Sequence, residues 1–253
     1  MRKLLLTLLL LGTISAKSFS QIVNIEDKRF NRDTTGIFGQ VDLGLNWVRN
    51  TSSVLSFNTG LRTDFVQAKQ NWLVLGNYNL IKSGDSRLVN AGFGHIRWTR
   101  KLSRSVNWEA FGQSQFDERV KMSYRGLLGT GPRLNLFPQG KQKLFFGILY
   151  MFEYNEINSG EAYFRDHRLS ISLSASLRLS PTLTVANTSY YQPVIATFGE
   201  ARLSSGTSFL LKITDKLSFS TTFNITYDGK IAEEVEGIPE TVHRLINGLR
   251  WNF

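Results

Sequence analysis

Three histidines, His95, His167 and His243, are the side chains of this 253-residue chain best suited to act as general bases near neutral pH. A hydrolase built on one of them would need a hydroxyl nucleophile and an orienting third group within hydrogen-bond reach. None of the three is followed by a serine two residues later, a spacing typical of lipid-facing hydrolases. His243 shares one face of a predicted strand with Leu245 and Leu249, so it is the best of three weak candidates for a catalytic base. We therefore expect no enzymatic activity.

Other chemistries find little support in the residue types. His167 stands between Asp166 and Arg168, and we expect a solvated residue where a loop enters a strand, with metal or lipid phosphate binding as the alternative. The chain has no cysteine, which excludes disulfides, thiolate metal sites, a catalytic thiol and lipidation at cysteine. The glycine run at 126–131 has no helix after it, so it lacks the converging amides of a phosphate-binding loop. The sequence predicts no metal and no cofactor.

Alternation with a period of two is the pattern that positions the remaining side chains. From Ile37 to Trp47 the odd positions are apolar or glycine, while polar residues gather at the even ones. This indicates a strand with one apolar face. Twelve such segments can be marked along the chain: 37–49, 54–65, 71–82, 87–100, 105–117, 123–137, 142–156, 166–179, 182–194, 202–213, 216–228 and 241–253.

The length of these segments predicts a membrane barrel. Most run 12 to 15 residues, whereas globular strands average about five to six residues and a tilted strand that crosses a bilayer needs about nine to eleven. With 42% hydrophobic residues and a mean hydropathy of -0.16, the chain cannot be a multi-span helical membrane protein. The predicted fold class is all-β, a transmembrane antiparallel up-and-down β-barrel of about 12 strands.

The polar phase of the strands should face the lumen and carries many charges. The predicted inward set is Arg62, Arg125, Arg133, Arg168, Arg178, Arg202, Lys212, Arg244 and Arg250 against Asp42, Asp64, Glu109, Asp117, Glu153 and Asp228. Two readings stay open. Nine positive and six negative charges favour a narrow aqueous pore with slight anion preference. Alternatively, the charges neutralise one another in a network that fills the interior, because buried charges need partners.

The start of the chain is a targeting signal. Residues 1–20 combine a basic start at Arg2 and Lys3 with a short apolar run and small residues, the pattern of a secretory signal peptide. We expect cleavage near Gln21, a periplasmic lead-in over 21–35 and the barrel over 36–253. Cleavage removes three positive charges and lowers the formal net charge from +10 to +7. An exported chain meets anionic lipid rather than nucleic acid, so the predicted partners are outer-membrane lipid and lipopolysaccharide, without nucleic acid.

Connections and aromatic residues give two further indications. Connections at the periplasmic end should be short, and those at the outer end, including Glu118 to Met122, Ile157 to Arg165, Ile195 to Ala201 and Gly229 to Glu240, should be longer. Aromatic rings gather at interfaces between lipid and water. The predicted interface tryptophans are Trp72, Trp98, Trp108 and Trp251 at the periplasmic ends of strands and Trp47 at an outer end.

Several segments carry a resemblance to a known family. The final strand places Leu249, Trp251 and the terminal Phe253 on one face, and it looks like the signal by which the barrel insertion machinery recognises outer-membrane proteins. The segments Val89–Leu102, Ala110–Gln113, Leu128–Arg133 and Tyr150–Tyr154 resemble the outer-membrane family labelled domain of unknown function 481. Some of its members are described as salt-induced outer membrane proteins. The resemblance implies a barrel in the outer membrane of a Gram-negative bacterium but no reaction.

Two functional classes therefore remain. The first is passive transport through a narrow, weakly anion-selective pore. The second is a non-conducting structural or envelope-stress barrel whose external loops make contacts; the sequence leaves the oligomeric state open.

Symmetric hairpins also predict a register, in which Arg125 lies opposite Glu153 and Asp42 lies opposite Arg62 on the lumen side.

Overall fold

The computed structural model describes residues 35–49, 53–139, 142–160, 162–215, 217–230 and 240–251. The strands are β1 (Gly36–Arg49), β2 (Ser53–Val66), β3 (Gln70–Ser83), β4 (Ser86–Lys101), β5 (Val106–Asp117), β6 (Met122–Asn135), β7 (Lys143–Ile157), β8 (Ala162–Arg178), β9 (Leu183–Pro193), β10 (Ala201–Lys212), β11 (Leu217–Asp228) and β12 (Thr241–Trp251). Two short 3-10 helices, η2 (Glu118–Val120) and η3 (Asn158–Gly160), follow β5 and β7.

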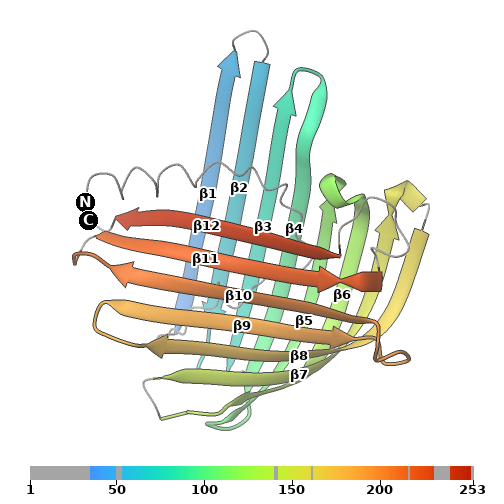
Figure 1. The fold of residues 1–253 in the computed structure, drawn as a ribbon. Helices are drawn as coiled ribbons and strands as arrows, with labels where there is room; N and C mark the ends of the chain where they lie inside the picture. The colour runs from blue at the N-terminus through green and yellow to red at the C-terminus, as the bar shows by residue number, and fades with distance from the viewer. Residues whose placement is uncertain are drawn as a thin grey trace.

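All twelve strands belong to one antiparallel sheet in which each strand pairs with the next along the chain. The sheet curls, so that β7 to β12 run across the view in front of the more upright β1 to β6 (Figure 1). This confirms the predicted all-β, up-and-down architecture. Within the described residues, no helix has the length and apolar character to span a membrane.

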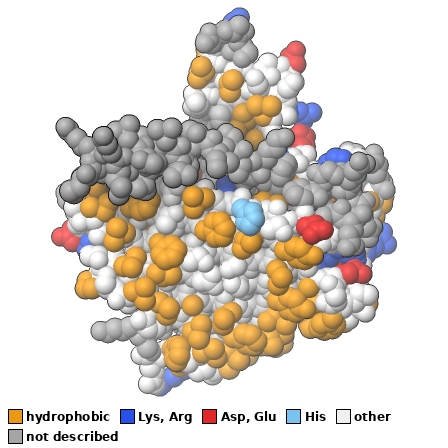
Figure 2. All heavy atoms as spheres, viewed as in Figure 1, with side chains coloured by type: hydrophobic (Ala, Val, Ile, Leu, Met, Phe, Trp, Pro, Cys, Tyr) orange, Lys and Arg blue, Asp and Glu red, His pale blue; other side chains and the backbone are white. Residues whose placement is uncertain are grey.

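The two faces of the sheet have opposite character. Along β10 the inward Arg202 is 1% exposed, whereas the adjacent outward Leu203 is 46% exposed. The same inversion holds around the sheet, where buried residues include many charged side chains and the exposed ones include 35 large hydrophobics. Hydrophobic side chains accordingly spread over the outer surface of the molecule (Figure 2). A surface of this kind suits a lipid environment and not water.

The β7–β8 hairpin corrects one prediction. The segment from Ile157 to Arg165 is not a long connection, because Ile157 ends β7 and Ala162, which pairs with it, begins β8. The turn is tight because Asn158 and Gly160 have left-handed φ values of 51° and 103°, which glycine tolerates best. Length therefore separates the two ends less than expected. The connections 194–200 and 229–240 are long at the outer end, but 136–142 at the inner end is as long as 194–200.

The hairpin register differs from the prediction by two residues in both predicted cases. Arg125 lies opposite Asn155, and Glu153 lies opposite Leu127. The amide of Leu136 donates to the carbonyl of Leu144 at 2.8 Å, which centres this hairpin one residue later than Gln139.

In the first hairpin Asp42 lies opposite Gly60, and Arg62 lies opposite Gln40. A shift of two residues preserves the face of every side chain. The inward and outward assignments therefore survive the error in register.

Aromatic residues lie at the strand ends as predicted. The rings of Trp72 and Trp98 are 6.3 Å apart near the inner ends of β3 and β4. Trp108 lies at the start of β5, and Trp47 lies near the outer end of β1. The predicted signal peptide, most of the lead-in, the side chain of Trp251 and Phe253 fall outside the described residues.

Candidate functional site

The lumen brings together nine of the predicted charges as buried side chains. They are Arg62, Glu109, Asp117, Arg125, Arg133, Glu153, Arg168, Arg202 and Asp228. Asp64 is half-buried beside Arg62, with 2.7 Å between Nε and the carboxylate. Buried charge of this density needs compensating partners. The predicted pattern of inward charges therefore does locate the polar interior.

Four other members of the predicted inward set are exposed, because they lie on edge strands or at the rim. Asp42 and Arg244 belong to β1 and β12, the two edge strands, each of which has one neighbour. Arg178 and Lys212 end β8 and β10 at the inner rim, where Arg178 donates to the carbonyl of Pro181 and Lys212 pairs with Asp215 at 2.6 Å. The side chain of Arg250 falls outside the described residues. Among the described residues, the buried and half-buried members of the predicted set are five arginines and five carboxylates, so this subset shows no excess of positive charge.

Glu153 on β7 is the centre of the largest polar cluster. Its carboxylate contacts the guanidinium groups of three arginines, at 2.7 Å from Arg125, 3.1 Å from Arg168 and 3.1 Å from Arg202. These arginines come from β6, β8 and β10, so the contacts reach beyond the strands that pair with β7. All four side chains are at most 2% exposed. A carboxylate in such surroundings is held by charge-assisted hydrogen bonds on several sides.

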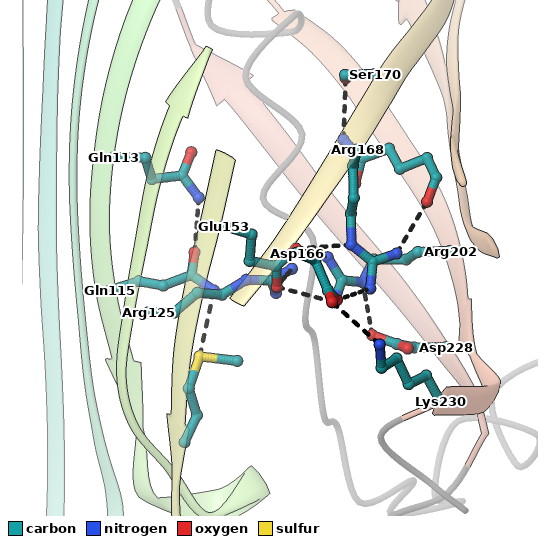
Figure 3. A network of polar contacts seen from close by, with 12 residues as sticks. Gln113, Gln115, Arg125, Glu153, Asp166, Arg168, Ser170, Arg202, Asp228 and Lys230 are labelled. Carbon is teal, nitrogen blue, oxygen red and sulfur yellow. Dashed lines mark hydrogen bonds and ion pairs between the residues drawn. The ribbon is translucent and has the colours of Figure 1, made fainter. Parts of the chain in front are cut away.

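Two further acids and a lysine extend this cluster toward the outer end (Figure 3). Arg202 pairs with Asp228 at 2.6 Å, and Arg168 pairs with Asp166 at 2.7 Å. Lys230 reaches Asp166 at 3.0 Å. We name this group the Glu153 network: Arg125, Glu153, Asp166, Arg168, Arg202, Asp228 and Lys230.

Lys230 joins the network to the outer connections. It also pairs with Glu200 at 2.8 Å, at the end of the connection from β9 to β10. Burial lowers the pKa of Lys230, but hydrogen bonds to Glu200 and Asp166 outweigh it and raise that pKa overall. The hydrogen bond from Lys230 lowers the pKa of Glu200. With Glu200 included, four cations face four carboxylates in this part of the lumen.

The sequence analysis missed Asp166 and Lys230 as lumen residues. Asp166 opens the predicted segment 166–179 but was left out of the inward set, although it alternates with His167 as an inward position should. Lys230 follows β11 within a stretch rich in acids, and no periodicity marks its direction.

A second cluster lies nearer the inner end, on β4 to β6. Glu109 accepts a 2.6 Å hydrogen bond from Arg97 and lies 3.6 Å from Arg133. The guanidinium carbons lie 4.9 Å and 4.2 Å from the ring centroids of Phe111 and Phe145, respectively, distances typical of cation–π contacts. We call Arg97, Glu109 and Arg133 the Glu109 cluster. Arg97 was overlooked, although its alternation with the outward Trp98 could have identified it.

Small polar side chains form the opposite wall of the lumen. Inward positions on β8 to β11 are occupied by Ser170, Ser174, Thr188, Ser204 and Thr226, all buried. Ser208 and Thr222 lie 2.9 Å apart further toward the inner end. Such side chains project less far into the interior than the arginines of β4 to β6. This wall therefore offers groups that can hydrogen-bond water along its length, including the part below the Glu153 network.

One histidine faces the lumen and the other two lie on the outer face of the sheet. His95 faces the lumen, where its Nδ1 lies 3.0 Å from Gln113 Oε1. His167 is within β8 on the outer face, 2.6 Å from the Tyr150 hydroxyl, and is not at the loop-to-strand boundary. His243 is exposed and stacks on Phe223 with ring centroids 6.0 Å apart. Across the described segments, no cluster of three or more potential ligands is placed to hold a metal ion.

Comparisons with known proteins found a matching protein family and similar solved structures. The family described as "Protein of unknown function, DUF481" matches residues 41–238. Among solved structures, a NanC porin is similar with 12% identity and a TM-score of 0.48, covering 78% of this chain and 94% of that chain. The translocator domain of the autotransporter NalP from Neisseria meningitidis is similar with 12% identity and a TM-score of 0.37, covering 88% and 90%. No curated protein matches the sequence.

Proposed function

The chain belongs to the DUF481 family of proteins of unknown function, and we propose that this member is an outer-membrane β-barrel that passes small ions through a narrow lumen. The observation that carries the proposal is the inverted polarity of the sheet, which buries charged and small polar side chains on its inner face and exposes hydrophobic ones on its outer face. We propose no enzymatic role.

The membrane position is supported by the sequence and by the outer surface. An exported chain with exposed leucines, valines and aromatic residues on its outward face is stable in lipid and aggregates in water. Fractionation of the native host should recover the protein with outer membranes, and an unboiled sample should migrate anomalously in detergent gels. Recovery in the soluble periplasm would contradict this part of the proposal.

The lumen geometry suggests a constriction with a vestibule below it. The Glu153 network occupies the outer part, where its side chains are almost fully buried. Below it, the small polar wall of β8 to β11 and the Glu109 cluster provide groups that hydrogen-bond water. The cluster holds two arginines and one glutamate. In a passage with low dielectric, arginines that outnumber carboxylates along the wall favour the entry of anions, and we propose weak anion selectivity.

A non-conducting barrel is the second candidate, and the pairing within the Glu153 network favours it. Arg125, Arg168 and Arg202 each contact a carboxylate, so the constriction has the character of a structural network. In that case the protein would act through its external connections, which would contact lipopolysaccharide or other envelope components. The barrel insertion machinery would be a partner during biogenesis in both cases.

Single-channel recording on refolded, full-length protein separates the two candidates. We expect a small conductance with weak anion selectivity. Arg133→Gln should move the reversal potential toward cation preference, because it removes a buried charge beside Glu109. The matched control is Arg178→Gln, which changes an exposed arginine at the inner rim and should have a weak effect that vanishes at high salt. No conductance at any salt concentration would overturn the transport proposal in favour of the structural one.

A further inference from the structure

A polar patch interrupts the hydrophobic outer face in the middle of β9 and β10. Its members are Asn187, Ser189, Ser205 and Thr207, which we call the Asn187 quartet. Ser189 lies opposite Ser205, and Asn187 lies opposite Thr207, in the register of the two strands. They share the outward phase with Leu203 and Phe209, which are 46% and 44% exposed. White polar side chains and backbone break the orange surface on the side formed by β8 to β12 (Figure 2).

The quartet sits within the apolar band and not at its rim. On β10 it is preceded by Leu203 toward the outer end and followed by Phe209 and Leu211 toward the inner end. On the neighbouring strands, Leu173 pairs with Ser189 and Phe223 pairs with Thr207, and both are exposed. Large hydrophobic side chains therefore frame a set of small polar ones. Polar groups that face lipid are costly unless they find hydrogen-bond partners.

Hydrogen bonds within the quartet satisfy most of its groups. Asn187 Nδ2 donates to Thr207 Oγ1 at 2.8 Å and to Ser205 Oγ at 3.1 Å. Ser189 Oγ donates to Asn187 Oδ1 at 3.1 Å and lies 2.9 Å from Ser205 Oγ. Because the Ser189 hydroxyl donates its hydrogen to Asn187, the Ser205 hydroxyl must be the donor in the hydrogen bond between the two serines.

The Thr207 hydroxyl is the one donor of the quartet that these hydrogen bonds do not use. The Thr207 hydroxyl accepts from Asn187, and among the described residues no acceptor is seen for its own hydrogen. Two lone pairs on the oxygens of Ser189 and Asn187 remain able to accept a hydrogen bond. The quartet thus offers a donor and acceptors side by side, a set that is complementary to itself under two-fold rotation.

We propose that the Asn187 quartet is the centre of an interface between two copies of this chain in the membrane. In a two-fold pair, the Thr207 hydroxyl of each copy donates to the quartet of the other. The small side chains let the two sheets approach closely, while the framing residues Leu203 and Phe209 pack around them. Serine, threonine and asparagine form such hydrogen bonds between transmembrane helices, and we apply the same physical argument to two sheets. The inference rests on the membrane position in the proposed function, but it does not depend on conduction.

Disulfide trapping tests the interface, because the chain has no cysteine of its own. Ser189→Cys, expressed in the full chain and oxidised in native membranes, should give a covalent dimer. The control is Ser114→Cys, an exposed outward serine on β5, which should stay near background. Equal cross-linking of both variants, or none at Ser189, would overturn the proposal.

A second variant tests the hydrogen bond itself. Thr207→Val keeps the shape of the side chain and removes the donor, and it should weaken dimerisation about tenfold in energy transfer between labelled copies diluted in vesicles. Dimerisation as strong as that of the unaltered protein would refute the role of this donor. Anomalous migration of the unboiled variant confirms that it has folded. A dimer without conductance would refute the transport proposal alone, whereas recovery outside the membrane would refute both.

Discussion

Replacing Glu153 by glutamine should destabilise the barrel strongly. The substitution preserves the size of the side chain and removes the charge that contacts Arg125, Arg168 and Arg202. Arg168 and Arg202 then keep the carboxylates of Asp166 and Asp228, whereas Arg125 loses its ion pair with Glu153. Breaking a buried ion pair by removing one partner costs about 3 to 5 kcal/mol, because the remaining charge stays desolvated. For a domain of this size, such a loss lowers the melting temperature by roughly 6 to 20 °C.

The assay is thermal or urea unfolding of refolded protein in detergent, followed by the unboiled gel shift and by tryptophan fluorescence. Glu156→Gln is the matched control, because Glu156 lies on the same strand but on the outward face, and it should change stability by less than about 0.5 kcal/mol. The double variant Glu153→Gln/Arg125→Gln should be less destabilised than the sum of the single variants, by about 0.5 to 3 kcal/mol. Equal stability of Glu153→Gln and the unaltered protein would refute the view that this carboxylate organises the lumen.

Two further predictions concern register and pH. Cysteines at Arg125 and Asn155 should cross-link on oxidation, because directly opposed Cβ atoms lie about 5 Å apart, whereas cysteines at Arg125 and Glu153 should react more slowly; the reverse order would restore the register predicted from the sequence. Lys230 lowers the pKa of Glu200, so this contribution to stability is present above the unfolded pKa and is lost as pH falls through the folded one. The effect should be small because Glu200 is exposed, and Lys230→Met should abolish it in unfolding curves measured between pH 6 and about 3.

The sequence predicts the fold well because period-two alternation is a local property. Each of the twelve segments can be recognised from its own residues, and the face of each side chain follows from its parity. Arg125, Glu153 and Arg202 were therefore placed in the lumen before any strand was paired. The same parity would have placed Arg97 inside, had it been applied throughout β4.

What the sequence could not predict depends on distances between segments. Register depends on where each hairpin turns, and an error of one residue at the centre moved the partner of Arg125 from Glu153 to Asn155. The convergence of Arg168 and Arg202 on Glu153 depends on how the sheet curls, which no single strand encodes. The alternation also could not predict that a side chain at the inner rim is exposed. It gives Arg178 the correct face of the sheet but not its position relative to the membrane.

The Glu153 network also has a mechanical consequence. Backbone pairing in this sheet joins only neighbouring strands, as in a linear array, so thermal opening can begin at either edge and peel strands away one at a time. The bond from Arg202 to Glu153 spans 49 residues of sequence and fastens β10 directly to β7. Opening that starts at β12 should therefore slow at β11 and β10, because the pair of Arg202 with Asp228 on β11 and its link to Glu153 must break as well as the ladders. Amide hydrogen exchange should show one protected block from β6 to β11, with faster exchange in β12.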